Sequence, residues 1–183
     1  MSMDRERSEN MRSWLVLITF FILTDQATKI VAQTLLSEGE SIEAVPFFNF
    51  LLVYNKGAAF SFLSDAGGWQ RWFFIFLASA VCIYLLVWLR NIKRTQRFLG
   101  IGLTFVLSGA LGNLIDRILH GKVTDFLDFY YVTKNDCLPF FFRLPPDTCH
   151  WPTFNVADIL ISVGAILLLV QITFDSKSTN EAD

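Results

Sequence analysis

The chain has 183 residues, which is enough for one domain. Hydrophobic residues make up 53% of it and charged residues only 17%, well below the charged fraction of about 25% that is usual in soluble domains. The formal net charge of -2 and the lack of a basic stripe argue against a nucleic-acid partner. The composition therefore favours a membrane protein over a soluble one.

Four apolar stretches approach the roughly 20 residues that a helix needs to cross a bilayer. In chain order they are predicted over residues 14–32, 72–89, 98–119 and 155–174. The first stretch contains Asp25 and Lys29 and lacks a small-residue cleavage site after its apolar part, so we interpret it as a retained span and not as a signal peptide. The predicted fold class is a membrane all-α protein with four transmembrane helices and a small β element.

The Lys and Arg residues outside these spans predict their orientation. Eight lie in the two tails and the short connection 90–97, whereas five lie in the longer segments 33–71 and 120–154. Both termini are therefore expected in the cytoplasm and the two longer segments on the outer side. In this orientation the polar residues of three spans fall in the outer half of the bilayer; they are Asp25, Lys29, Asn113, Asp116, Arg117, Asn155 and Asp158.

Between the first two spans, residues 45–63 read VPFFNFLLVYNKGAAFSFL. This segment is apolar and aromatic, but Pro46, Asn49 and the run Asn55-Lys56-Gly57 interrupt it. We interpret it as a strand, a turn and a second strand, and not as a span. Gly57 is expected to supply the positive φ that such a turn requires.

The ionisable residues within the spans carry an energetic cost, because an Asp at the centre of a membrane helix costs about 2.5–3.5 kcal/mol. Asp25 and Lys29 are four residues apart and can pair along one helix. Asp116 is followed directly by Arg117 and shares a helix face with Asn113. A polar network that joins helices and a functional site are both compatible with this pattern.

Asp125 and Asp158 differ from these residues. Asp158 has no basic residue three or four positions away, and Asp125 has only Lys122. Two carboxyl groups brought together in surroundings of low polarity hold one proton between them, because both cannot ionise cheaply. One can then activate water while the other protonates a leaving amine, as peptide hydrolysis by an aspartyl pair requires. The long stretch of chain between them does not by itself establish contact.

Other sites for hydrolysis lack their residues. The chain has two His and no H-E-x-x-H motif, and neither G-x-S-x-G nor S-x-x-K occurs. No metal or cofactor is therefore expected. A small proton-relay or transport protein that uses the same carboxylates stays open as an alternative function, although it predicts polar residues through the whole depth of the bilayer. A purely structural scaffold leaves Asp158 without a role.

Five motifs occur in order along the chain and agree with the four-span topology: DQATK (25–29), YNKGAAFS (54–61), GALGNLIDR (109–117), GKVTDF (121–126) and FNVAD (154–158). Together they resemble the lipoprotein signal peptidase family, also called signal peptidase II. The resemblance implies an aspartyl endopeptidase of the bacterial inner membrane. Such enzymes cut prolipoproteins before the diacylglyceryl-modified cysteine and are inhibited by the cyclic peptide globomycin.

The resemblance also implies roles for individual residues. The catalytic pair falls on Asp125 and Asp158. Supporting and substrate-binding roles fall on Asp25, Lys29, Asn55, Gly57, Asn113, Asp116, Arg117, Asn155 and Ala157. The resemblance further implies a single peptidase domain over residues 1–183, with its active site near the periplasmic face and a β-sheet platform built around residues 45–63.

The segment 130–153 is longer than the resemblance leads us to expect. It contains Cys137 and Cys149, separated by 11 residues of which three are Pro, on the side that is oxidising if the membrane is a bacterial inner one. A disulfide and two free thiols are both open alternatives here. Cys82 lies within the second predicted span and is interpreted as a small buried apolar residue.

Overall fold

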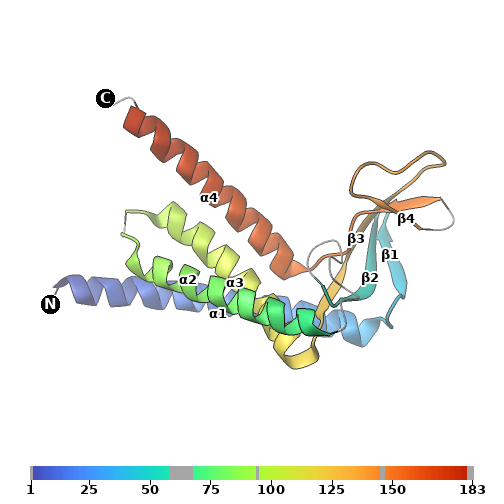
Figure 1. The fold of residues 1–183 in the computed structure, drawn as a ribbon, viewed down its shortest axis with the longest axis horizontal. Coiled ribbons are helices and arrows are strands. Elements are labelled where there is room, and N and C mark those ends of the chain that lie inside the picture. The colour runs from blue at the N-terminus through green and yellow to red at the C-terminus, as the bar shows by residue number, and fades with distance from the viewer. Residues whose placement is uncertain (1, 58–67, 94, 145–146, 181–183) are drawn as a thin grey trace. The chain divides into compact units, whose positions relative to one another are not determined.

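The computed structural model of the chain describes residues 2–57, 68–93, 95–144 and 147–180, with side chains described from residue 11 to residue 174 within these ranges. Four long helices and five short strands follow one another along the chain (Figure 1). The helices are α1 (Ser2–Leu35), α2 (Trp69–Asn91), α3 (Arg97–His120) and α4 (Val156–Asn180).

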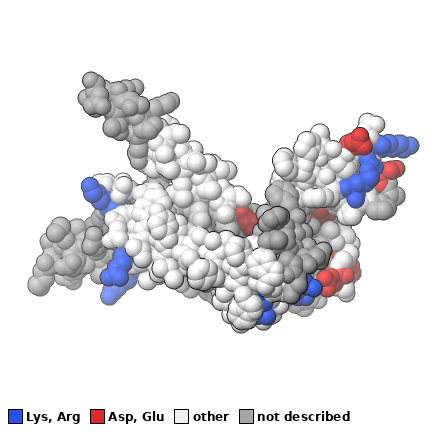
Figure 2. All heavy atoms as spheres, viewed as in Figure 1, with Lys and Arg blue, Asp and Glu red and all other residues white. Residues whose placement is uncertain are grey.

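The four predicted spans are confirmed. Within the described residues, four helical stretches are long and apolar enough to cross a membrane: Met11–Leu35, Trp69–Asn91, Arg97–His120 and Val156–Phe174. Their exposed flanks carry almost no charged side chains on the face shown in Figure 2, as expected for surfaces that contact lipid. In α3, 61% of the apolar window is buried, against 22% or less in the other three, so α3 is the most enclosed span.

The strands are β1 (Ser41–Val45), β2 (Phe48–Asn55), β3 (Val123–Val132), β4 (Phe142–Leu144) and β5 (Thr148–His150). They form one antiparallel sheet in the order β1-β2-β3-β5-β4. The ten-residue strand β3 is central, and it pairs with β2 along its first part and with β5 along its last. An antiparallel bridge between Leu127 and Phe154 then leads the chain from the sheet to α4.

The structure contains a hairpin that the sequence pattern did not predict, formed by β1 and β2. Its turn lies at Pro46 and Phe47, and β2 ends at Asn55, the first residue of the run that the sequence predicts as a turn. The positive φ is found at Phe47 (74°) and not at Gly57. Pro46 explains the position, because its fixed φ favours the first corner of a turn. The second predicted strand falls mostly on residues 58–63, which lie outside the described residues.

The chain divides into two compact units, which we describe separately. The helix unit comprises Met1–Asp25, Leu77–Leu114 and Val156–Asp183, and the sheet unit comprises Gln26–Phe76 and Ile115–Asn155. The core of the helix unit includes Leu89, Leu103 and Leu107, which are at most 2% exposed. The sheet unit contains all five strands of the described residues, the C-terminal ends of α1 and α3, and the N-terminal end of α2.

A disulfide joins Cys149 of β5 to Cys137, which precedes β4, and the two Cα atoms are 5.6 Å apart. Cys149 is fully buried and lies opposite Tyr131 of β3. Beside it, His150 Nδ1 lies 2.8 Å from Oδ2 of the buried Asp128. The longer segment noted in the sequence therefore forms a cross-linked extension of the sheet.

The disulfide can be tested by alkylation of the denatured protein before and after reduction. We expect one modified cysteine, Cys82, without reductant and three after reduction, measured by intact mass. A disulfide that closes a loop with a sequence separation of 12 residues stabilises the folded chain by about 3 kcal/mol in the chain-entropy model. The effect of reduction on activity should nevertheless be small, since the candidate catalytic residues lie outside the hairpin. Three modified cysteines in non-reduced protein from an oxidising compartment would contradict the bond.

Candidate active site

Asp125 stands on β3, the central strand of the sheet. Its side chain is only 3% exposed, and Asn155 Nδ2 donates a hydrogen bond to its Oδ1 atom at 2.6 Å. This short contact with an amide donor fixes the orientation of the carboxylate. Asn155 is itself fully buried, so the contact is shielded from water.

Thr124, the residue before Asp125, is held at each of its polar groups. Its backbone N donates to Asp116 Oδ2 (3.0 Å), its carbonyl accepts from Asn155 Nδ2 (3.2 Å), and its hydroxyl oxygen accepts from Gln33 Nε2 (2.7 Å). The hydrogen bonds come from α1, α3 and the segment before α4. Two of these bonds hold the backbone next to Asp125 and the third holds the side chain of Thr124, which is 1% exposed.

Asp116 also forms a buried ion pair. Lys29 Nζ lies 3.2 Å from Asp116 Oδ2, and the two side chains are 3% and 4% exposed. Gln26 Nε2 donates to the other carboxylate oxygen at 3.0 Å. This ion pair joins α1 to α3, whereas the sequence had suggested pairing along each helix. We call Lys29, Asp116, Thr124, Asp125 and Asn155 the Thr124 cluster.

Arg117 contacts a different part of the sheet unit. Its Nη2 atom donates to the carbonyl of Gly57 at 2.9 Å, and its guanidinium lies 5.4 Å from the centre of the Phe74 ring. The backbone N of Gly57 donates to Asn55 Oδ1 at 2.9 Å, which closes a tight turn after β2. Three of the predicted supporting residues, Asn55, Gly57 and Arg117, are therefore brought together.

In the helix unit, Asp158 lies in the first turn of α4 and is half-buried. Asn113 Nδ2 donates to Asp158 Oδ1 at 2.8 Å. Asp25, which is fully buried, accepts a hydrogen bond from the backbone N of Ala157 at 2.9 Å. Because the first N–H groups of a helix lack partners within it, Asp25 acts as a cap for α4 although it belongs to α1. We call Asp25, Asn113, Ala157 and Asp158 the Asp158 cluster.

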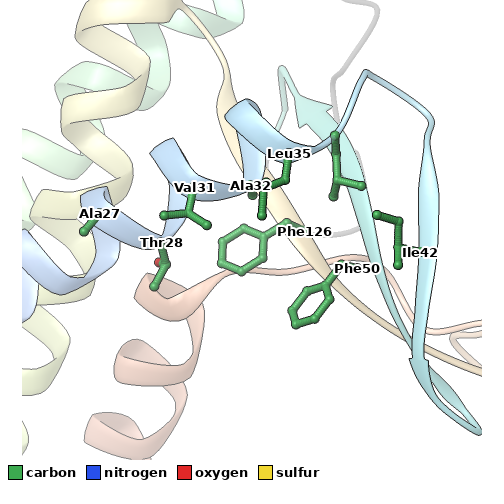
Figure 3. Close-up of a pocket in the computed structure, with 9 residues that line it drawn as sticks. Ala27, Thr28, Val31, Ala32, Leu35, Ile42, Phe50 and Phe126 are labelled. Carbon is green, nitrogen blue, oxygen red and sulfur yellow. The ribbon is translucent and has the colours of Figure 1, made fainter.

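An apolar cavity of about 330 Å³ lies in the sheet unit. Phe126, the neighbour of Asp125, lines it together with Phe50, and these rings face Thr28 and Val31 of α1 (Figure 3). The remaining lining residues are Ala27, Ala32, Leu35, Leu36 and Ile42. Successive side chains of a strand point to opposite faces, so Phe126 lines the cavity while Asp125 points away from it. A cavity with these walls suits a hydrocarbon group.

Several residues of the site were not singled out from the sequence. Thr124, Gln26 and Gln33 lie next to or near predicted residues, but nothing in their spacing indicates which partner they bind. Arg71 entered the sequence analysis only as one of the positive charges that predict the orientation of the spans. It donates from Nε to the carbonyl of Arg117 (3.1 Å) and from Nη2 to that of Ile118 (2.8 Å), so it satisfies carbonyl groups at the end of α3. The sequence feature that could have pointed to this role is a basic residue directly before a predicted span.

Both candidate catalytic carboxylates share one chemical feature. Each accepts a hydrogen bond at one oxygen from an Asn amide, Asp125 from Asn155 and Asp158 from Asn113. An amide donor orients a carboxylate without supplying a competing charge. A carboxyl group held in this way can serve as a general acid or a general base.

Comparison with known proteins supplies the family. A family model described as signal peptidase (SPase) II matches residues 17–174. A lipoprotein signal peptidase of Aeromonas hydrophila is 44% identical over 172 residues, which cover 93% of this chain and 93% of that protein. One of Hydrogenovibrio crunogenus is 47% identical over 159 residues, covering 87% of this chain and 83% of that protein.

Two solved structures, both described as bacterial membrane enzymes, are also similar to the chain. One superimposes with a TM-score of 0.73 at 29% identity and covers 91% of this chain and 90% of its own. The other has a TM-score of 0.68 at 28% identity, with 87% of this chain and 92% of its own covered. The similarity therefore includes both the spans and the sheet.

Proposed function

The chain belongs to the signal peptidase II family, and we infer that it is an aspartyl endopeptidase that uses Asp125 and Asp158 as its catalytic pair. As a member of this family, the chain is a multi-pass membrane enzyme that processes the signal peptides of lipoproteins. We propose that its substrates are prolipoproteins that carry a diacylglyceryl group on cysteine, that it cuts directly before this cysteine, and that residues 1–183 act as one peptidase domain without a cofactor.

In the proposed reaction, one carboxylate of the pair takes a proton from water while the water oxygen forms a bond to the carbonyl carbon of the residue before the modified cysteine. The other carboxyl group protonates the cysteine nitrogen as the C–N bond breaks. The products are a free signal peptide and a lipoprotein with a new amino terminus. General acid and base catalysis by two such groups contributes about 10²–10⁴-fold for each proton transfer.

The observation that carries this proposal is the common environment of the two carboxylates, each held by an Asn amide, in a chain of this family. The Thr124 cluster supports the role of Asp125, because Asp116 and Asn155 hold the backbone N and carbonyl of the preceding residue. The apolar cavity beside Phe126 supports a substrate that carries acyl chains.

The proposal is tested with purified protein in lipid and a prolipoprotein modified with diacylglyceryl. We expect cleavage before the modified cysteine, identified by mass spectrometry of the released peptide, and inhibition by globomycin. The matched control is the same precursor without the lipid, which should not be cut. Equal cleavage of both precursors would contradict the proposed substrate, and no cleavage of either would contradict the proposed function.

We further propose that the protein lies in the bacterial inner membrane with both termini in the cytoplasm, so that its active site is near the periplasmic face. The distribution of Lys and Arg supports this orientation. A cysteine placed at the exposed position Glu43 should react with an impermeant thiol reagent in intact cells, whereas one at the exposed position Lys93 should not. Labelling at position 93 would reverse the orientation.

A further inference from the structure

We propose that Gly109 and Gly112 are positioning residues for Asp158, because only glycine at these two places lets the first turn of α4 rest directly on α3. The inference depends on the proposed function in one respect, the catalytic role of Asp158. It adds two residues that neither contact the substrate nor ionise.

Gly109 allows the backbone of α4 to approach the backbone of α3. A Cβ atom built on Gly109 would lie 2.2 Å from the carbonyl oxygen of Ala157 and 3.1 Å from its carbonyl carbon. These are backbone atoms of the first turn of α4, so no rotamer change can relieve the contact. Any side chain at position 109 must therefore displace the turn that carries Asp158.

Gly112 makes room for the cap of α4. A Cβ atom built there would lie 2.5 Å from Asp25 Oδ2 and 3.1 Å from Asp25 Cγ. The other oxygen of this buried carboxylate, Oδ1, accepts the hydrogen bond from the backbone N of Ala157. A methyl group at position 112 would push the carboxylate away and weaken the cap one residue before Asp158.

Asn113 completes the arrangement from the same face of α3. Residues 109, 112 and 113 are spaced by three and four positions, so they lie together on one side of a helix. Gly109 sets the approach of the turn, Gly112 admits the cap, and Asn113 donates to Asp158 Oδ1. The position of the carboxylate thus depends on two close contacts that a single methyl group would alter.

The same pair of helices offers a matched control nearer its other end. A Cβ atom on Gly164 of α4 would lie 2.7 Å from Val106 Cγ2 and 2.8 Å from the carbonyl oxygen of Gly102. The contact is tight and includes backbone, but Gly164 is six residues beyond Asp158 and belongs to neither cluster. A substitution there tests close packing of α3 and α4 without touching the first turn of α4.

The experiment compares Gly112→Ala with Gly164→Ala in the full-length protein, using the lipid-modified precursor. Ala is a better helix former than Gly, so a loss in either variant comes from the contact and not from the helix itself. We expect Gly112→Ala to lower kcat by about 10²-fold with KM changed by less than about threefold, because a displacement near 1 Å has such an effect on a reacting group. Gly164→Ala should lower the melting temperature and leave kcat within about threefold of the wild type.

A double-variant cycle tests whether the effect passes through Asp25. In an Asp25→Ala background the methyl group meets no carboxylate, so adding Gly112→Ala should change kcat by less than about twofold. This double variant also serves if Gly112→Ala alone cannot be purified, because it removes the clashing group. If the losses of kcat caused by Asp25→Ala and Gly112→Ala simply multiply in the double variant, the inference is overturned. A wild-type kcat for Gly112→Ala would also overturn it. So would a loss of kcat in Gly164→Ala equal to that in Gly112→Ala.

The inference and the proposed function fail in distinguishable ways. Normal turnover by Asp158→Asn would overturn the catalytic assignment, whatever the glycine variants do. An inactive Asp158→Asn variant together with a fully active Gly112→Ala variant would overturn the positioning role alone.

Discussion

Replacement of Asp125 or of Asp158 by Asn is expected to lower the turnover of a lipid-modified precursor by at least about 10³-fold. An amide can neither accept the proton of the attacking water nor donate one to the leaving amine, so each variant loses half of the proposed acid–base pair. The protein should remain folded, because Asn keeps the size of Asp and the oxygen that accepts from Asn155 or Asn113. Turnover is measured by mass spectrometry and folding by thermal unfolding in detergent.

Asp128→Asn is the matched control for these variants. Asp128 is a buried Asp on the same strand as Asp125, and it also accepts from an Asn amide, Asn49 Nδ2, at 3.2 Å. Its other contact is with His150, at the base of the disulfide-linked hairpin. We expect Asp128→Asn to lose some stability and to keep activity within about tenfold. Near-normal turnover by either Asp125→Asn or Asp158→Asn would disprove the catalytic assignment.

The spans could be predicted from the sequence because the requirement is simple: a long apolar stretch of sufficient length. Each predicted span lies within the corresponding helix apart from Asn155, which directly precedes α4. The ends were less predictable. Trp69, Gln70 and Arg71 extend α2 by one turn beyond the predicted start, because Arg71 donates to the carbonyl groups at the end of α3. Such a contact is invisible in local hydropathy.

The hairpin of β1 and β2 shows a second limit. Asn55-Lys56-Gly57 has the composition of a hairpin turn, and the structure does bend there, but Asn55 Oδ1 holds the bend and Arg117 binds its carbonyl from another element. Pro46 and Phe47 form the actual hairpin turn although Phe rarely adopts a positive φ. Pairing of β1 with β2 selects this turn, and pairing between strands cannot be deduced from residue preferences alone.

The partners of the polar residues were the least predictable part of the site. Spacing by three or four residues shows which side chains share a face of one helix, but it does not show which helix lies opposite. Spacing therefore matched Lys29 with Asp25 on its own helix and did not indicate its ion pair with Asp116 of α3. The two Asn amides that hold Asp125 and Asp158 likewise come from residues 30 and 45 positions away. The residue types of the site were predictable, and the way they connect was not.

The ion pair of Lys29 and Asp116 provides the second large expected effect. Asp116→Asn should lower the free energy of unfolding by about 3–5 kcal/mol, because it removes the negative charge that lies 3.2 Å from the buried ammonium of Lys29. The carboxylate also accepts from Thr124 N and Gln26 Nε2. An amide has a single acceptor oxygen, so its NH₂ group must face at least one of these donors. Activity should fall as well, since Thr124 precedes Asp125.

Two further variants separate the charge from the hydrogen bonds. Asp147→Asn removes the charge of an exposed pair with Arg143 at 3.7 Å, and it should cost no more than about 1 kcal/mol because solvent screens that pair. Lys29→Met in the Asp116→Asn background removes the buried ammonium that has lost the charge of Asp116 and should restore part of the lost stability. Thermal unfolding in one detergent compares these three variants with the wild type. No recovery in the double variant would show that the hydrogen bonds to Thr124 and Gln26, and not the buried charge, make Asp116 necessary.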